Sequence, residues 1–298
     1  MSCILIAITH LDHAPLDPSL ISALERKFGA KSRWLAEGEA ADMVLDGYDP
    51  ADAKSLVADM LSDSADPTRV DIAVLPAHHR RKRLLISDMD STMITVECID
   101  ELADFAGVKS DVAAITRRAM KGELDFAAAL RERVALLEGL HVTVIDEVYA
   151  ERVRLMSGAR ILVQTMRGFG ATTALVSGGF VPFAERVAHD IGFETVIANR
   201  LEIVDGRLTG QILPPITGAE TKLSTLTQLM RSHNLHPDET LALGDGANDL
   251  PMIKAAGLGV AFRPHPVLAD ASDAIIQAGD LTAVLYLQGV PRDEFFVE

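Results

Sequence analysis

The 298-residue sequence is short of cysteine, of positive charge and of long apolar runs. Its two cysteines, Cys3 and Cys98, cannot build a framework of several disulfide bonds, which favours a reducing, cytoplasmic setting. Lysine and arginine number 28 against 43 aspartate and glutamate residues, and a net charge of −15 argues against binding to nucleic acid or anionic lipid. No apolar run approaches the ~20 residues of a membrane span, and the N-terminal stretch lacks the basic leader of a secretory signal.

One strongly basic run interrupts this acidic composition at residues 78–83, which read His-His-Arg-Arg-Lys-Arg. Basic runs of this length are found in nucleic-acid patches. Because the rest of the chain is so acidic, we expect instead a solvated linker that leads into the following strand.

The first 80 residues have the pattern of a small separate domain. Short β-rich segments alternate with segments of helical periodicity in the order βαββαβ, which is the ferredoxin-like pattern. We expect strands near 4–8, 32–36, 42–46 and 70–75, and helices near 19–28 and 51–62. The order resembles the ACT family of small-molecule-sensing domains, which implies an amino-acid effector. A structural or dimerising module, acting in a homodimer, fits the same pattern, and the sequence leaves the two readings open.

Residues 81–298 alternate between strands and helices. We expect strands near 84–87, 172–176, 195–198, 240–243 and 257–261, and helices near 161–169, 183–191, 223–232 and 250–256. Asp205-Gly206 predicts a hairpin turn between strands at 201–204 and 208–212. Such alternation predicts an α/β fold, with a Rossmann-like doubly wound parallel sheet covered by helices on both faces. Residues 98–155 have a helical pattern without a strong strand and form an insertion.

Two aspartates, Asp88 and Asp90, directly follow the expected strand at 84–87. In an open parallel sheet, ligands bind beyond the carboxyl ends of the strands. Taken alone, an Asp-x-Asp segment is more typical of a turn or a helix cap. Two carboxylates at the end of a buried strand are costly, however, unless a cation or a substrate offsets their charge.

Two more aspartates, Asp245 and Asp249, follow the expected strand at 240–243 in a segment that reads Gly-Asp-Gly-Ala-Asn-Asp. Its glycines permit a tight turn. Oxygen ligands without a nearby histidine or cysteine suit Mg²⁺ better than Zn²⁺. The plainer interpretation of this segment alone is a strand-to-helix loop with an Asn or Asp cap.

Ser177, Gly178 and Lys222 are candidates for holding an anion. Ser177 and Gly178 follow the strand at 172–176, where a hydroxyl and free backbone N–H groups at a helix start bind phosphate oxygens. Alone they would be an ordinary capped turn, and a lone lysine is normally a surface residue. Ser177, Gly178 and Lys222 indicate an anion site only in combination with the four aspartates.

These four features, in this order, resemble the haloacid dehalogenase superfamily of phosphotransferases from about residue 83 to the C-terminus. The superfamily pattern is Asp-x-Asp-x-Thr, a strand ending in Ser or Thr, a Lys, and Gly-Asp-x-x-x-Asp, and the chain departs from it nowhere. The resemblance implies that Asp88 attacks phosphorus and that Asp90 serves as acid and then as base. It also implies a Mg²⁺ ion held by Asp88, Asp245 and the backbone carbonyl of Asp90.

The same resemblance assigns supporting roles and a helical cap at 98–155. Ser177, Gly178 and Lys222 would hold the phosphoryl oxygens. Asn248 and Asp249 would support the substrate, the metal waters and the lysine.

Two segments, one at the start of the insertion and one within it, resemble phosphoserine phosphatases within that superfamily. Residues 91–97 end in Glu97, which would meet a substrate ammonium, and residues 126–134 contain Arg133, which would meet a substrate carboxylate. An amino acid carries one cation and one anion, and a bidentate guanidinium suits a carboxylate. The resemblance implies hydrolysis of O-phospho-L-serine, the last step of serine biosynthesis.

Three alternative functions compete with this interpretation. A related phosphatase or phosphotransferase would act on another small phosphomonoester. A serine-sensing module with an inert phosphatase-like core is disfavoured, because no catalytic position is substituted. Nucleic-acid binding rests only on residues 78–83.

Overall fold

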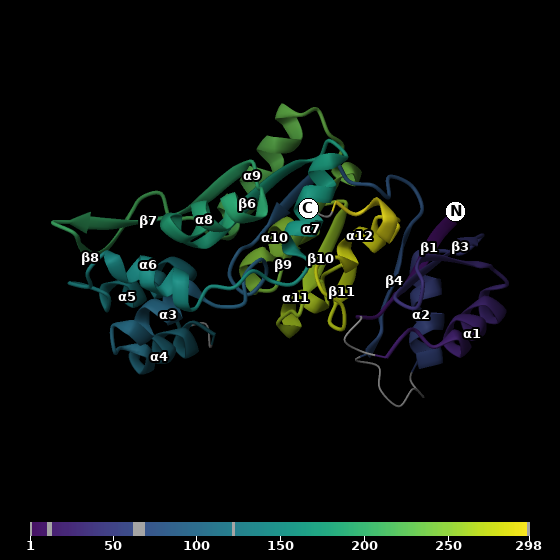
Figure 1. Cartoon of the computed structure of the whole chain (residues 1–298), viewed down its shortest axis with the longest axis horizontal. Helices are drawn as coiled ribbons and strands as arrows, with labels where there is room; N and C mark the ends of the chain where they lie inside the picture. The colour runs from purple at the N-terminus through teal and green to yellow at the C-terminus, as the bar shows by residue number, and fades with distance from the viewer. Residues whose placement is uncertain (1, 11–13, 62–68, 121–122, 297–298) are drawn as a thin grey trace.

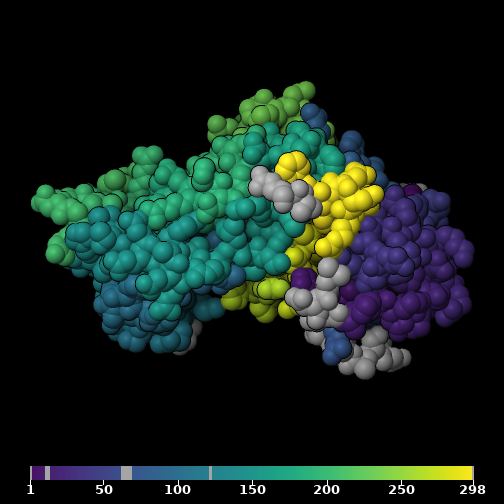
Figure 2. Space-filling model, in the orientation of Figure 1, coloured from purple at the N-terminus to yellow at the C-terminus, as the bar shows by residue number. Residues whose placement is uncertain are grey.

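Two β-sheets form the framework of the chain. A computed structural model describes residues 2–10, 14–61, 69–120 and 123–296. The smaller, N-terminal sheet lies at one end of the molecule and a group of helices lies at the other, with the larger sheet between them (Figure 1). In the space-filling view the C-terminal segment, in yellow, lies directly against the N-terminal part (Figure 2). No helix in the described ranges has the length and apolar character needed to cross a membrane.

The larger sheet consists of β5 (Leu84–Ser87), β6 (Thr172–Phe180), β7 (Thr195–Val204), β8 (Arg207–Leu213), β9 (Thr240–Gly244), β10 (Leu258–Phe262) and β11 (Ala274–Ile276). Its strand order is β11-β10-β9-β5-β6-β7-β8. Neighbouring strands run parallel, except that β8 returns antiparallel to β7. The central strands are continuous apolar runs because helices cover both of their faces. The predicted α/β fold with a parallel sheet is confirmed.

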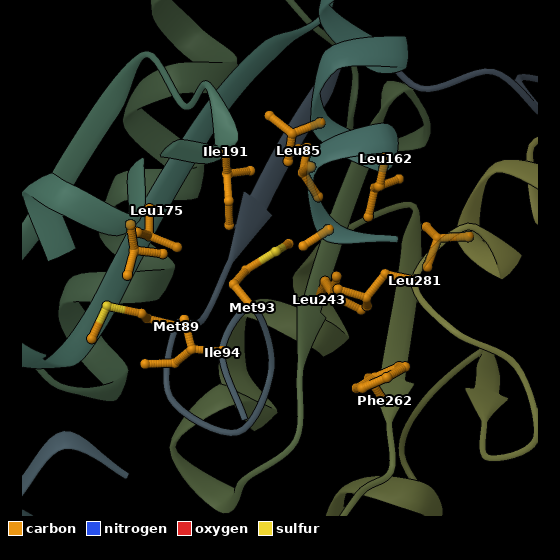
Figure 3. Packing of buried hydrophobic residues seen from close by; sticks show 14 of the residues in the cluster. Leu85, Met89, Met93, Ile94, Leu162, Leu175, Ile191, Leu243, Phe262 and Leu281 are labelled. Atoms are coloured by element: carbon orange, nitrogen blue, oxygen red, sulfur yellow. The ribbon is translucent and has the colours of Figure 1, made fainter. Parts of the chain in front are cut away.

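Helices on both faces bury this sheet. They are α7 (Ala159–Gly168), α8 (Val181–Ile191), α9 (Ala219–Ser232), α10 (Leu250–Ala255), α11 (Pro266–Ala269) and α12 (Ala283–Leu287). Side chains alternate between the faces along each strand. Leu85 and Leu243 point into the main core with α7, α8 and α12 (Figure 3). Ile86 and Ala242 point the other way, into a smaller core under α9, α10 and α11.

Four helices form the insertion between β5 and α7. They are α3 (Cys98–Phe105), α4 (Lys109–Met120), α5 (Phe126–Ala135) and α6 (Thr143–Glu151), and together they are called the cap. Two chain segments, 93–97 and 153–158, join the cap to the sheet. They run antiparallel to each other and pair at Ile94 and Leu155. These two segments are called the hinge.

A second connection reaches the cap from the opposite side. The β7–β8 hairpin extends past the edge of the sheet toward α5 and α6 (Figure 1). Its backbone pairs with the loop between those helices, since the N–H of Gly139 donates to the carbonyl of Leu208 at 2.8 Å and the N–H of Val142 to that of Gly206 at 2.9 Å. The cap is therefore held at its hinge and at this hairpin.

The N-terminal sheet is formed by β1 (Ser2–Ile8), β2 (Ser32–Ala36), β3 (Ala40–Asp46) and β4 (Asp71–Pro76), with α1 (Pro18–Phe28) and α2 (Pro50–Leu61) between its strands. It is antiparallel, in the order β2-β3-β1-β4. Cys3 and Leu5 on one face pack beneath α1 and α2. Ile4, Ile6 and Ile8 on the other face join the main core that also contains α12. The observed element order is the βαββαβ expected from the sequence.

The basic run at 78–83 differs from the solvated linker that we expected. The side chain of Arg80 is only 13% exposed and forms an ion pair with Asp42 on β3. Arg80 also donates at 3.0 Å to the carbonyls of Tyr286 and Leu287 at the end of α12. The other cations of the run have partners too: Arg81 with Glu294, Lys82 with the Asp238 carbonyl and Arg83 with Glu239. The expectation is wrong for Arg80 because its guanidinium joins the N-terminal sheet to α12, one of the helices that cover the larger sheet.

Two strand boundaries also differ from expectation. The strands expected near 195–198 and 201–204 are one continuous strand, β7, which leaves the parallel sheet and becomes the first arm of the hairpin. The strand expected near 172–176 continues to Phe180, with an irregular register between Val176 and Phe180. A residue pattern does not reveal where one strand changes partners.

We expect loss of the Arg80 guanidinium to destabilise the whole chain. Among the described residues, Arg80→Ala leaves the buried Asp42 carboxylate with Arg33 as its one remaining ion-pair partner, so the free energy of unfolding should fall by about 3 kcal/mol. The matched control, Arg81→Ala, removes an exposed pair with Glu294 and should cost less than about 1 kcal/mol. Urea unfolding followed by circular dichroism measures both losses. Equal losses in the two variants would contradict the role given to Arg80.

Candidate active site

The strand order of the larger sheet reverses between β5 and β9, which are parallel neighbours. Asp88 directly follows β5, and Asp245 directly follows β9. The N–H of Asp88 donates to the carbonyl of Leu243 at 3.0 Å and ties the two strand ends together. Both carboxylates therefore lie at the carboxyl edge of the sheet, at the point where open α/β sheets bind their ligands.

Apolar side chains fix the backbone that carries the first two aspartates. Met89 and Met93 are fully buried in the main core, with Met89 near Leu175 (Figure 3). Because Met89 lies between Asp88 and Asp90, its burial holds the loop that presents both carboxyl groups. Packing of the two methionines in the main core therefore fixes the position of this loop.

A buried lysine lies among three carboxylates. Asp88, Asp245 and Asp249 each offer an oxygen atom within 4.8 Å of the others. The Nζ atom of Lys222, on α9, lies 2.8 Å from Asp88 Oδ2 and 2.6 Å from Asp249 Oδ1. The lysine side chain is fully buried. The structure thus brings together residues from three distant parts of the sequence that the motifs had singled out.

The charges in this cluster are not balanced. Burial alone would lower the pKa of Lys222, but the negative charges of Asp249 and Asp88 outweigh burial and raise it. Burial and the charge of Asp88 raise the pKa of Asp245 to about 7. Burial also raises the pKa of Asp249, to about 6, against the opposing effect of Lys222. Raised carboxyl pKa values of this kind indicate a site that lacks positive charge.

The donor set fits a divalent cation. Three carboxylates face one ammonium, which leaves a formal excess of two negative charges. The cluster offers oxygen ligands, which hard cations such as Mg²⁺ prefer. Asp88 and Asp245 are the better candidates for direct ligands, because Asp249 is fully buried and already occupied. Its Oδ1 accepts from Lys222, and its Oδ2 accepts from the N–H groups of Asp245 and Gly246.

Asp90 lies beside the cluster in a different environment. Burial first, and then the negative charges of Glu97 and Asp88, raise the pKa of Asp90 well above its usual range. The N–H of Cys98 donates to Asp90 Oδ1 at 3.4 Å. A Cβ atom on Gly179 would lie 2.8 Å from Asp90 Oδ2, so that glycine gives the carboxyl group its space. Asp90 is therefore suited to carry a proton while its neighbour does not.

The C-terminal part of β6, at residues 177–180, is held by an asparagine that the sequence analysis missed. Ser177 is buried, and its Oγ accepts from the N–H of Gly179 at 2.9 Å. The side chain of Asn199, fully buried on β7, donates to the carbonyls of Gly178 at 2.8 Å and Thr217 at 3.2 Å. It also accepts from the N–H of Thr217 at 2.7 Å. In the sequence Asn199 is marked only as a polar residue after the apolar run 196–198, which does not identify its partners.

Glu97 and Arg133 carry opposite charges on the cap side of the site. Glu97 precedes α3, is exposed to solvent and accepts from the Ser91 hydroxyl at 2.6 Å. Arg133 lies on α5, where its Nε donates to the carbonyl of Ala129 at 3.3 Å. Burial lowers the pKa of Arg133, and the charges of Asp100 and Glu97 act in the opposite direction. The two residues expected to meet an amino acid therefore lie within each other's electrostatic reach.

Phe126, a second residue without a role in the sequence analysis, is one of the contacts between cap and core. It is the first residue of α5. A Cβ atom on Gly178 would lie 2.9 Å from the ring, and one on Gly218 would lie 3.1 Å from it. The two glycines, at the end of β6 and at the start of α9, therefore make room for this ring.

Asn248 lies on the same loop as Asp245 and Asp249, within the short helical turn Ala247–Asp249. Its side chain is half-buried, and a Cβ atom on Gly246 would lie 2.6 Å from Asn248 Oδ1. The absence of a side chain at Gly246 lets Asn248 fold back over the loop. The structure places it at the border of the carboxylate cluster.

Comparison with known proteins gives consistent matches. Residues 85–254 match the haloacid dehalogenase-like hydrolase family. A curated phosphoserine phosphatase of Streptomyces coelicolor is 44% identical over 236 residues, which are 78% of this chain but 57% of that protein, so the chain spans less than two thirds of its length. The phosphoserine phosphatase of Idiomarina loihiensis is 44% identical over 202 residues, which are 68% of this chain and 91% of that protein. The crystal structure of a probable phosphoserine phosphatase from Vibrio cholerae aligns with a TM-score of 0.76 at 30% identity, covering 98% of this chain and 88% of that one.

We expect a divalent cation to stabilise the folded chain through the carboxylate cluster. At a free Mg²⁺ concentration of 100 times Kd, binding to one site adds about 2.7 kcal/mol to the free energy of unfolding. Asp245→Asn should raise the melting temperature in EDTA, because it relieves repulsion, and should abolish the increase caused by Mg²⁺. The exposed Asp111→Asn is the control and should leave both values unchanged. Thermal unfolding in EDTA and in Mg²⁺ measures the difference, and an undiminished increase in Asp245→Asn would exclude this cluster as the site.

Proposed function

The chain belongs to the haloacid dehalogenase-like hydrolase family, and we propose that it hydrolyses O-phospho-L-serine to L-serine and phosphate with Mg²⁺ as its cofactor. The observation that carries this proposal is the meeting of Asp88, Asp245 and Lys222 at the neighbouring ends of β5 and β9. Relatives named phosphoserine phosphatases support the choice of substrate.

In the proposed mechanism Asp88 is the nucleophile. A carboxylate oxygen of Asp88 attacks phosphorus in line, and the bond between phosphorus and the seryl oxygen breaks. Asp90 is protonated, because burial and like charges raise its pKa, and it gives that proton to the departing seryl oxygen. A water molecule then attacks the phosphorus of the aspartyl phosphate while Asp90 takes its proton. Phosphate leaves, and Asp88 is restored.

Positive charge is required because the substrate phosphate and the carboxylates repel each other. Each like-charge pair ~4 Å apart costs roughly 4 kcal/mol at an effective dielectric constant near 20. Lys222 offsets part of this cost and would hold phosphoryl oxygens together with the Ser177 hydroxyl and the backbone at Gly178. When bound, Mg²⁺ would neutralise charge on the phosphoryl group and orient it.

The metal ligands in this proposal are Asp88, Asp245 and the backbone carbonyl of Asp90. Asp249 would act on them indirectly, because it holds both Lys222 and the backbone of the Asp245 loop. Asn248, at the border of the cluster, would support the substrate and the metal waters.

Recognition of the amino-acid part is assigned to the cap side of the site. Glu97 would bind the substrate ammonium, and Arg133 would bind its carboxylate. The position of Phe126 over Gly178 and Gly218 supports a cap that closes onto the core and excludes water during the reaction. A phosphate ester without an amino and a carboxylate group would forgo both contacts.

The N-terminal 80 residues are proposed to form a separate domain, with the phosphatase core and its cap at 81–298. The apolar side chains beneath α1 and α2 form a core of their own, which supports the division. Two roles fit the βαββαβ layer: an ACT-like domain that binds an amino-acid effector, and a module that assembles a homodimer. Ligand binding and sedimentation of the full chain distinguish them.

We expect Asp88→Asn to abolish turnover of phosphoserine while the melting temperature changes little. The amide is a far weaker nucleophile than the carboxylate. Release of phosphate is measured from phosphoserine and from a panel of sugar and nucleotide phosphates, each with Mg²⁺ and with EDTA, using Asp111→Asn as the control. An active Asp88→Asn protein would exclude the covalent route. Faster turnover of a sugar phosphate would favour the alternative substrate, and no turnover with Mg²⁺ would favour an inert sensing module.

The selectivity of the cap provides an independent test. Arg133→Ala should raise KM for phosphoserine by about a hundredfold, which corresponds to a lost charge-assisted contact of about 3 kcal/mol, and should hardly affect p-nitrophenyl phosphate. Arg131→Ala, an exposed arginine on the same helix, is the matched control. Equal effects of Arg133→Ala on both substrates would contradict the assigned role.

A further inference from the structure

One loop touches both the N-terminal sheet and the cap hinge. It consists of residues 277–281, which lie between β11 and α12, and is called the tether loop. The carboxylate of Asp71, the first residue of β4, is buried against it and accepts three of its backbone N–H groups. The donors are Gln277 at 2.8 Å, Ala278 at 3.0 Å and Gly279 at 2.8 Å. A single carboxylate of the N-terminal sheet therefore fixes the first half of the loop.

The second half of the tether loop holds the hinge. Asp280 Oδ2 accepts from the hydroxyl of Ser157 at 2.7 Å, and the N–H of Leu281 donates to the Ser157 carbonyl at 3.1 Å. The next hinge residue, Gly158, has φ +78° and lies so close that a Cβ atom on it would be 2.6 Å from the nitrogen of Thr282. Side chain, backbone and packing thus all join this loop to the hinge.

The tether loop is also anchored in the main core and contacted a second time from the N-terminal part. Leu281 is fully buried in the main core, in the same cluster as Leu162 and Phe262 (Figure 3). A second contact from the N-terminal part reaches the loop directly, since His10 Nε2 lies 3.7 Å from Asp280 Oδ2. A shift of the N-terminal sheet would accordingly reach the loop through two residues.

The hinge in turn leads to the substrate side of the site. Its two segments are joined by backbone hydrogen bonds, from the N–H of Met156 to the Met93 carbonyl at 2.8 Å and from the N–H of Thr95 to the Arg154 carbonyl at 3.0 Å. The first of these segments ends in Glu97, which is assigned to the substrate ammonium. Movement of the segment held by the tether loop is therefore transferred to the segment that carries this glutamate.

We propose that Asp71 is a positioning residue for the cap. Through the tether loop, the N-terminal sheet sets the position of the hinge and hence the grip of the cap on the amino-acid part of the substrate. The kinetic consequence rests on the function proposed above, whereas the mechanical link between Asp71 and the hinge does not. A ligand or partner that displaced β4 would change the enzyme's affinity for its substrate by this route.

The test compares two buried carboxylates of the N-terminal sheet. Asp71→Asn leaves one carbonyl oxygen where three N–H groups need acceptors, and so it loosens the tether loop. Asp42→Asn weakens the ion pair with Arg80 between the same two parts of the chain without touching that loop. Hydrogen exchange of peptides covering the hinge, melting temperature, and KM and kcat for phosphoserine and p-nitrophenyl phosphate are measured for both variants in the full chain with Mg²⁺.

We expect Asp71→Asn to speed exchange in the hinge and to raise KM for phosphoserine about fivefold or more, with little effect on kcat or on p-nitrophenyl phosphate. Asp42→Asn should lower the melting temperature without either effect. Ser157→Ala removes the side-chain hydrogen bond to Asp280 and so weakens the link at its other end. It should therefore act in the same direction as Asp71→Asn, and the double variant should add little to it. This keeps the test valid if Asp71→Asn does not fold.

Unchanged hinge exchange in both Asp71→Asn and Ser157→Ala would overturn the link. Equal exchange and KM in Asp71→Asn and Asp42→Asn would reduce Asp71 to a structural role and overturn it as well. If the wild-type chain does not hydrolyse phosphoserine, the function proposed above fails, while hinge exchange still decides whether Asp71 controls the hinge.

Discussion

The site depends on one buried ammonium group. Lys222 lies between Asp88 and Asp249 with its side chain fully removed from solvent, and these carboxylates keep it charged. A buried charge is tolerated only when its partners are held in place. Here the partners are fixed by the ends of β5 and β9 and by the helical turn that follows, so the geometry of the sheet sets that of the charges. The remaining excess of negative charge is what makes the site receptive to a divalent cation.

Much of this arrangement could be predicted because it is encoded locally. Asp88 and Asp245 each follow a short apolar strand, and parallel strands place such residues at a common edge. Asn199 and Phe126 could not be found this way, since their roles depend on loops that are distant in sequence. Burial of Arg80 was also hidden, because its partner Asp42 lies 38 residues earlier in the sequence, on β3.

Close packing explains why two glycines at the centre of the site cannot be replaced by residues with a side chain. A Cβ atom at Gly244 would lie 2.3 Å from the carboxyl carbon of Asp249, and one at Gly179 would lie 2.8 Å from Asp90 Oδ2. These glycines are needed for close approach, and both have their φ outside the left-handed region. The carboxyl groups of Asp249 and Asp90 thus occupy space that is free because Gly244 and Gly179 have no side chains. A larger residue at either glycine would therefore displace a carboxyl group of the site.

The β7–β8 hairpin has a consequence for how the cap moves. A cap joined to the core at a hinge alone can rotate about it as a rigid body. This cap is also attached to the hairpin by backbone hydrogen bonds at Gly139 and Val142. Two attachments on opposite sides leave little freedom for such a swing. Exchange of small molecules with solvent then requires either flexing of individual helices or a hairpin that travels with the cap. β7, the strand that leaves the parallel sheet, therefore limits how far the cap can rotate about its hinge.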